Sequence, residues 1–153
     1  GVDLCADLRD GLPLRDACLD YVCCVHVLQD LAFFDVPPAL RELRRVLRAG
    51  GVLRLVLPDL ERAMGAWNER DAAWFHVPDR DARTVGAKLV TQIVWYGSVR
   101  TPFTFDFAQE MLEGAGFVRV LRCAHGVTAS AHEDIVLLDN RERESLHVEA
   151  SRP

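Results

Sequence analysis

The sequence lacks the features of several protein classes. No apolar run approaches the ~20 residues that a membrane-spanning helix needs, and the first residues have neither the basic nor the apolar region of a signal peptide. A long basic run is also absent, and the 153 residues carry a formal net charge of -5. An acidic chain repels the phosphate backbone of nucleic acids. We therefore expect a cytoplasmic protein without a nucleic-acid or membrane partner.

Paired metal-binding or redox motifs are absent as well. The five cysteines include no Cys-x-x-Cys pair, the spacing typical of structural zinc sites and redox dithiols. Cys23 and Cys24 are adjacent within an apolar run, which predicts buried thiols. His125, His132 and Glu133 lie close together, but their spacing matches no standard ligand pattern. The sequence therefore predicts no metal site.

The residues that are present suit one globular domain, because 50% are apolar and 27% charged. Strands are expected at residues 2–8, with Asp7 at the carboxyl end, at 19–28 and at 52–57. A helix is expected from Asp35 to a stop at Gly50-Gly51. A strand, helix and strand joined by short turns are typical of a right-handed βαβ unit, and so of an α/β fold with a parallel sheet.

The second half of the chain continues this pattern. Helices are expected at 59–67 and 85–96, and a third from Thr104 or Asp106 to Gly116. A strand at 117–121 follows, and then a hairpin of strands at 135–138 and 145–150. The alternation in the last strand predicts an antiparallel C-terminal strand on a mostly parallel sheet. No linker or internal repeat divides residues 1–153.

Aromatic residues are concentrated in the middle third of the chain. A cluster of this kind can line an apolar pocket for a small molecule, or it can pack in the core or against a partner. The sequence alone leaves these alternatives open. The residues concerned are Trp67, Trp74, Phe75, Trp95, Tyr96, Phe103, Phe105 and Phe107.

Three segments of the chain are similar to the sequence motifs of one known family. From Asp7 the chain reads D-L-R-D-G-L-P-L, followed by L-D-Y-V, similar to the family's D-L-x-x-L-P-F…F-D-x-V passage. From Val25 it reads V-H-V-L-Q-D-L, similar to S-H-V-L-E-H-L. From Leu43 it reads L-R-R-V-L-R-A-G-G and continues to Pro58-Asp59-Leu60, similar to the family's R-V-L-K-P-G-G…V-P-D-L.

Together these segments resemble the class I S-adenosylmethionine-dependent methyltransferases. The ending Pro58-Asp59-Leu60 and the closing residues 138–141 and 144–150 resemble a bacterial branch of the type 11 kind within that family. The resemblance implies a Rossmann-like fold and S-adenosylmethionine as the cofactor. Asp7 would accept a hydrogen bond from the adenine amino group, and the amide of Leu8 would meet a ring nitrogen. Val25 and His26 would lie along the cofactor. His26 is also the candidate catalytic residue, as a general base, because an imidazole titrates near neutrality. The implied reaction is methyl transfer to an unidentified small-molecule or sugar-type acceptor.

The chain departs from the family at its beginning. The Gly-rich loop after the family's first strand, and the acidic residue after its second, have no counterpart here. We therefore expect a single partial methyltransferase-like domain without the N-terminal strands, either a fragment of a longer enzyme or a reduced relative. The alternative function is a non-catalytic remnant that acts as an interaction or dimerisation module, in which an uncovered sheet edge pairs two copies. Whether the chain alone is an enzyme stays open at this point.

Overall fold

The computed structural model describes residues 5–153, which form a four-stranded sheet with helices. The strands lie in the order β1-β2-β4-β3. β1 and β2 are parallel, whereas β4 is antiparallel to both β2 and β3. The prediction of an α/β fold with a mostly parallel sheet and an antiparallel C-terminal strand is therefore confirmed. The elements are β1 (Leu19–Val25), α1 (Val36–Val46), β2 (Leu47–Pro58), α2 (Leu60–Asn68), α3 (Val85–Val94), α4 (Phe105–Gly114), β3 (Val118–Cys123) and β4 (Ser145–Ser151).

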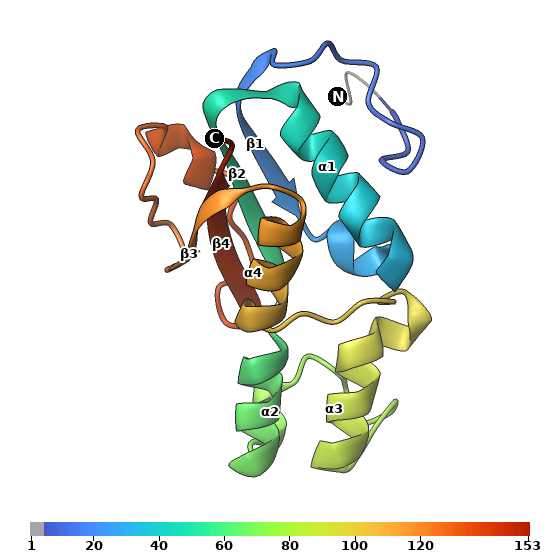
Figure 1. The fold of residues 1–153 in the computed structure, drawn as a ribbon. Coiled ribbons are helices and arrows are strands. Elements are labelled where there is room, and N and C mark those ends of the chain that lie inside the picture. Colours follow the sequence, from blue (N-terminus) through green and yellow to red (C-terminus); the bar gives the residue numbers. More distant parts are fainter. Residues whose placement is uncertain (1–4) are drawn as a thin grey trace.

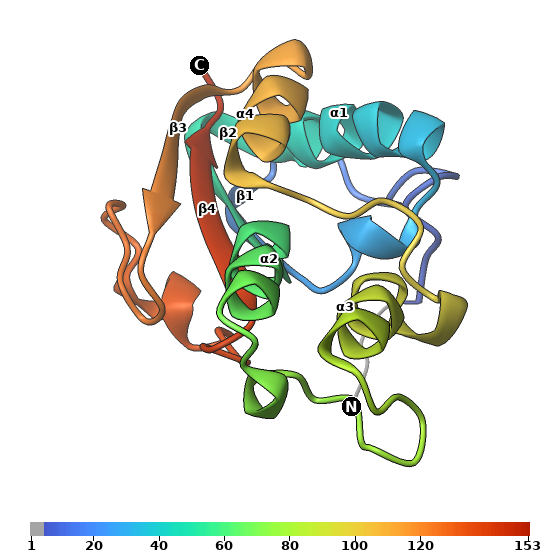
Figure 2. The same ribbon diagram turned by 90° about the horizontal axis from the view of Figure 1, so that it is seen from below.

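The two faces of the sheet have different covers. Helices α1 and α4 pack on one face, and α2 and α3 lie beyond the carboxyl ends of β1 and β2 (Figure 1). The segment between β3 and β4 runs over the opposite face (Figure 2). The main core lies between the sheet and the two covering helices, and it includes Leu53, Leu55 and Val148.

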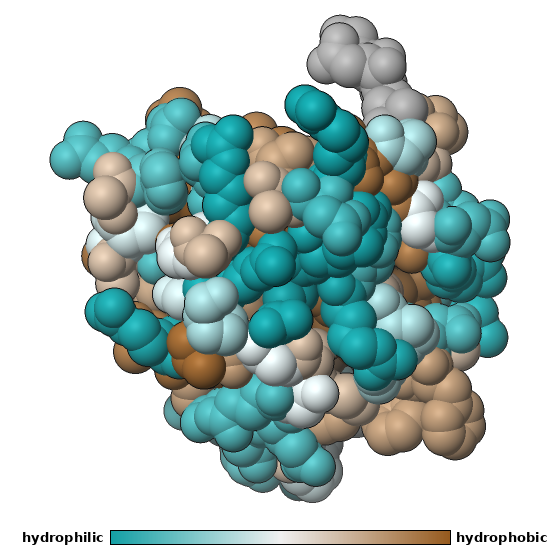
Figure 3. Space-filling view, turned by 45° about the horizontal axis from the view of Figure 1, so that its top comes forward, coloured by the Kyte–Doolittle hydropathy of each residue, from teal (hydrophilic) through white to brown (hydrophobic). Residues whose placement is uncertain are grey.

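Helix α1 shows why this arrangement forms. Val36, Leu40 and Leu43 recur on one side of the helix and are buried against the sheet. Pro37 and Pro38 stand in the first turn, where the missing amide donors are not needed. Hydrophilic residues run across the middle of the molecular face shown in Figure 3.

The sequence suggests that the pair Gly50-Gly51 ends helix α1, but the structure shows that it does not. The helix ends at Val46, and β2 begins directly with Leu47. Gly50 lies inside β2 with a φ of 77°, which favours glycine. A Cβ at Gly51 would lie only 2.9 Å from the carbonyl oxygen of Arg48. Both glycines therefore serve a bend within the strand, where β1 and β2 shift register.

The predicted N-terminal strand is not observed where the chain is described. Residues 2–4 of that prediction lie outside the described residues, and residues 5–8 form no strand. Asp7 therefore does not end a strand but stands in a turn, where its carboxylate accepts a hydrogen bond from the backbone amide of Arg9.

The predicted strand at residues 135–138 is also wrong. Glu133–Val136 forms a short 3₁₀ helix, and Leu137 and Leu138 are exposed. The apolar residues there indicate a strand only locally, whereas β4 finds both of its partners in distant segments, β2 and β3. No helix among residues 5–153 is long and apolar enough to cross a bilayer.

Candidate functional site

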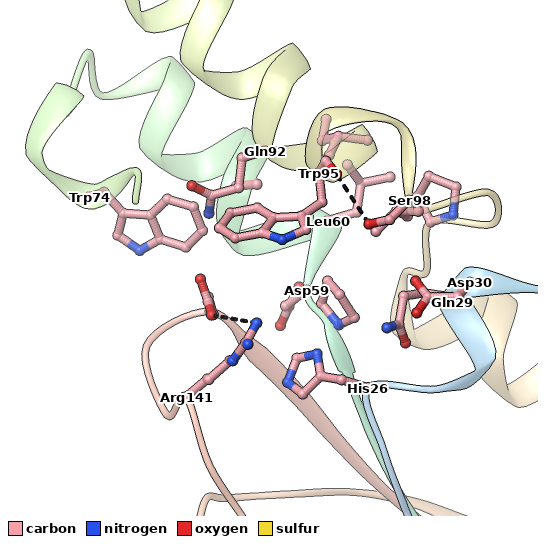
Figure 4. Close-up of a pocket in the computed structure, with 16 residues that line it drawn as sticks. His26, Gln29, Asp30, Asp59, Leu60, Trp74, Gln92, Trp95, Ser98 and Arg141 are labelled. Carbon is pink, nitrogen blue, oxygen red and sulfur yellow. Dashed lines mark hydrogen bonds and ion pairs between the residues drawn. The ribbon is translucent and has the colours of Figure 1, made fainter. Parts of the chain in front are cut away.

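A cavity of about 300 Å³ opens at the carboxyl ends of β1 and β2. The ends of these strands supply His26, Pro58 and Asp59, and the region of α2 and α3 covers the cavity from the other side (Figure 4). Ligands of open α/β sheets bind at this edge, because the loops after parallel strands converge there. The cavity is therefore the candidate functional site.

His26 follows directly after the last residue of β1, which ends three residues earlier than the strand expected at 19–28. Its backbone continues the ladder, with its amide donating to the carbonyl of Val56, and then turns at a φ of 50°. Its Nε2 lies 3.2 Å from Oγ of Ser145 on β4. Burial, and then the positive charge of Arg141, lower the pKa of His26 to about 4. The imidazole is therefore neutral at physiological pH, with a nitrogen available as a hydrogen-bond acceptor.

Charged groups from the turn before β4 form a second part of the lining. Arg141 lies 3.7 Å from Glu144, and Glu144 lies 2.8 Å from Nε2 of His76. Asp59, which directly follows β2, is a further charged residue of the lining and is buried. Its carboxylate caps α2 by accepting a hydrogen bond from the backbone amide of Arg62, and it pairs with Arg122 at 2.9 Å. The cavity therefore offers both cationic and anionic groups in fixed positions.

The opposite wall is aromatic. Trp74 and Trp95 face the charged groups, with Gln92 beside them (Figure 4). Trp95 and Tyr96 both take positive φ values, of 39° and 57°, at the end of α3. Consecutive non-glycine residues in the left-handed region of φ and ψ are strained, and such strain persists where the surrounding structure fixes the backbone.

The predicted aromatic pocket is thus formed by only part of the cluster. Trp74 and Trp95 line the cavity. Phe75 and Phe103 are buried in the core, and Tyr96 is 57% exposed, with its hydroxyl donating to Asp81. The cluster is therefore divided between the cavity, the core and the surface, and the binding of a small molecule by the cavity stays a prediction.

The predicted cofactor residues do not surround one cavity. Asp7 is exposed and paired with Arg9 at 2.6 Å, and Arg9 lowers the pKa of Asp7 to about 2 by hydrogen bonding. Leu8 packs against the main core. Val25 lines a shallow groove along β1, whereas His26 lines the cavity. A joint role of these four residues in binding one cofactor therefore stays a prediction.

Sequence reasoning missed several residues of the cavity. No role for Gln29, Arg141 or Glu144 follows from the sequence patterns described above. All three line the cavity, and the backbone carbonyl of Gln29 accepts hydrogen bonds from the amides of Arg100 and Thr101. Only the pairing of β4 between β2 and β3 brings the turn before β4 to this place, and no local signal shows it.

Comparison with known proteins agrees with the fold. Residues 2–55 match the model of a methyltransferase domain family. The resemblance to class I S-adenosylmethionine-dependent methyltransferases is confirmed. No curated protein sequence matches the chain.

Solved methyltransferase structures share the architecture. A methyltransferase of Thermotoga maritima, described as a possible histamine N-methyltransferase, aligns with 95% of this chain at 18% identity and a TM-score of 0.55. A methyltransferase of Archaeoglobus fulgidus aligns with 97% of it at 12% identity and a TM-score of 0.59. Human N-acetylserotonin methyltransferase, in complex with S-adenosylmethionine, aligns with 96% at 16% identity and 0.54.

This methyltransferase-like chain is shorter than those proteins. It covers 61%, 66% and 32% of the three structures, respectively. At these identities the likeness concerns the fold. The chain thus has the class I methyltransferase architecture over about a third to two thirds of its neighbours' length.

Proposed function

We propose that this chain takes part in methyl transfer from S-adenosylmethionine to a small-molecule acceptor that binds in the cavity beside His26. The supporting observation is the position of the cavity, at the carboxyl ends of β1 and β2 of a methyltransferase fold. Its mixed lining, with Trp74 and Trp95 opposite Arg141 and Glu144, suits an acceptor that has a flat apolar part and polar substituents.

The described residues fit the adenine end of the cofactor. The carboxylate of Asp7 keeps 39% of its side-chain surface exposed, and the four hydrogen bonds that it accepts all come from Arg9, so an amino group would take the place of one of these exposed bonds. The groove along β1 offers an apolar surface from Val22, Val25 and Val27. When bound, S-adenosylmethionine supplies an electrophilic methyl group.

The residues of this chain would act by positioning. A neutral His26 accepts a hydrogen bond from a hydroxyl or amine of the acceptor and fixes its direction. With a pKa of about 4, the imidazole is a weak base at neutral pH, so orientation carries more of the effect than proton removal. The tryptophan wall excludes water around the acceptor.

A calorimetric titration with S-adenosylhomocysteine tests the proposal. We expect saturable binding with one site, and about tenfold weaker binding for Asp7→Ala, because a charge-assisted hydrogen bond is lost. Asp10→Ala, an exposed carboxylate in the same turn, is the matched control and should bind like the unmodified chain. Absence of binding by folded protein would contradict the proposal.

A second candidate function rests on the outer edge of β1. In the described sheet β1 pairs with β2 alone, so its other edge has no strand beside it. We propose as the alternative that this edge joins a second copy, which makes the chain an interaction or dimerisation module. Light scattering tests it, since a dimer that persists on dilution is expected, and a monodisperse monomer would contradict it.

A further inference from the structure

Two histidines and a carboxylate meet on the sheet face opposite α1 and α4. His147 lies on β4, His125 follows β3 by two residues, and Asp139 lies in the segment between these strands. One nitrogen of each imidazole and one oxygen of Asp139 all lie within 4.8 Å of one another. The two rings lie 5.3 Å apart, between centroids, in an edge-to-face arrangement.

The two imidazoles are incompletely satisfied. His147 is only 2% exposed, and its Nε2 has no hydrogen-bond partner among the described residues. Nδ1 of His125 is likewise buried and without such a partner. Leaving a buried polar atom without a partner is unfavourable, so these two nitrogens on neighbouring rings indicate an occupant that the described residues do not supply.

The carboxylate is oriented by other groups. Nε and Nη2 of Arg54 donate to the two oxygens of Asp139, at 2.7 and 2.5 Å, and the amide of Gly126 donates at 2.8 Å. A carboxylate has about four lone-pair positions, so these three bonds leave one free. Hydrogen bonds of this kind orient the ligands of protein metal sites.

The local charge permits a cation despite Arg54. The guanidinium also pairs with Glu149 at 2.7 Å, so the cluster holds two carboxylates against one buried cation. With neutral imidazoles its formal charge is negative. Nε2 of His147 and Oδ2 of Asp139 lie 3.8 Å apart, too far for a hydrogen bond between them.

We propose that His125, Asp139 and His147 bind a divalent transition-metal ion of the zinc type. Two imidazole nitrogens and one carboxylate oxygen are a ligand set suited to zinc and its neighbours rather than to magnesium or calcium, which prefer oxygen ligands. The site joins the segment between β3 and β4 to the sheet, and it does not depend on methyl transfer.

The experiment is a calorimetric titration of the untagged, reduced protein with zinc chloride, with thermal unfolding followed in parallel. We expect one zinc per chain and a melting temperature that rises with zinc concentration. His125→Ala should weaken binding by ~10- to 100-fold or more. Because His125 is only half-buried, this variant leaves the core unchanged. His147→Gln is the second variant, which removes the other imidazole but conserves the side-chain volume, and it should weaken zinc binding as well.

His132→Ala and Cys123→Ser are the controls. His132 lies in the same segment but packs on Tyr21, and Cys123 is the strand neighbour of His147. Both variants should bind zinc like the unmodified chain. Absence of zinc binding, binding that survives His125→Ala, or binding that is lost with Cys123→Ser but not with His125→Ala would each overturn the proposal.

Discussion

The two faces of the sheet are built from alternate residues of the same strands, yet they are stabilised differently. Leu53, Leu55 and Val148 face α1 and α4 and form an aliphatic core. Arg54 and Glu149 point to the other face, where they are as deeply buried as the leucines. Helices cover the first face, and an irregular segment covers the second (Figure 2).

This difference follows from what each cover can offer. A helix satisfies its own backbone, so it needs only apolar side chains toward the sheet. An irregular segment carries backbone groups that need partners, and Arg54 supplies them by donating to the carbonyls of Ala124 and Val127. One buried guanidinium thus holds the segment in place, together with Asp139 and Glu149.

The largest expected effect comes from Arg54→Met. Burial alone would lower the pKa of this guanidinium, but the pairs with Asp139 and Glu149 raise it, so the charge is retained. Removing it leaves two buried carboxylates unpaired, and we expect a loss of about 3–5 kcal/mol in the free energy of unfolding. Urea denaturation measures it.

Leu55→Met is the matched control for that variant. It places the same new side chain one residue further along β2, on the helix-covered face, and should cost under about 1.5 kcal/mol because volume is conserved. Equal losses in the two variants would show that the faces do not differ in kind.

A charge-removed variant sharpens the comparison. Combining Arg54→Met with Asp139→Asn and Glu149→Gln removes the unpaired charges, so we expect it to recover about 1–4 kcal/mol relative to Arg54→Met alone. No recovery in urea denaturation would mean that lost packing, rather than unpaired charge, explains the cost of Arg54→Met.

A smaller effect concerns pH. The folded pKa of His26 is lowered to about 4 from an ordinary 6.5, so the unfolded chain binds a proton that the folded chain rejects. The free energy of unfolding is therefore unaffected by this histidine above pH 6.5 and decreases as the pH falls from 6.5 toward 4. Discounted for partial exposure, we expect a loss of about 1–2 kcal/mol over this range. His26→Gln should reduce that pH dependence, and an unchanged slope would contradict the burial argument.

The smallest effect is expected at the exposed pair of Asp7 and Arg9. Both side chains are largely solvated, so Asp7→Ala should leave the urea midpoint unchanged within error. A clear loss of stability would mean that the turn is more tightly integrated into the fold than its exposure indicates.

The sequence predicts the apolar face better than the polar one. Repeated leucines and valines identify α1, β1 and β2, because their burial depends on local periodicity. Arg54 interrupts an apolar run, and nothing near it in the sequence shows that its partners are Asp139 and Glu149. The same limit applies to the cavity, where His26 was found from a motif but Arg141 and Glu144 depend on how β4 pairs.

The measurement that tests the methyltransferase assignment most directly is an NMR titration of the ¹⁵N-labelled chain with S-adenosylhomocysteine. The account predicts saturable shifts of the amides of Leu8, Val25 and His26, with those of β3, at the far edge of the sheet, unchanged. Shifts confined to other parts of the chain, or no shifts in a folded protein, would contradict it.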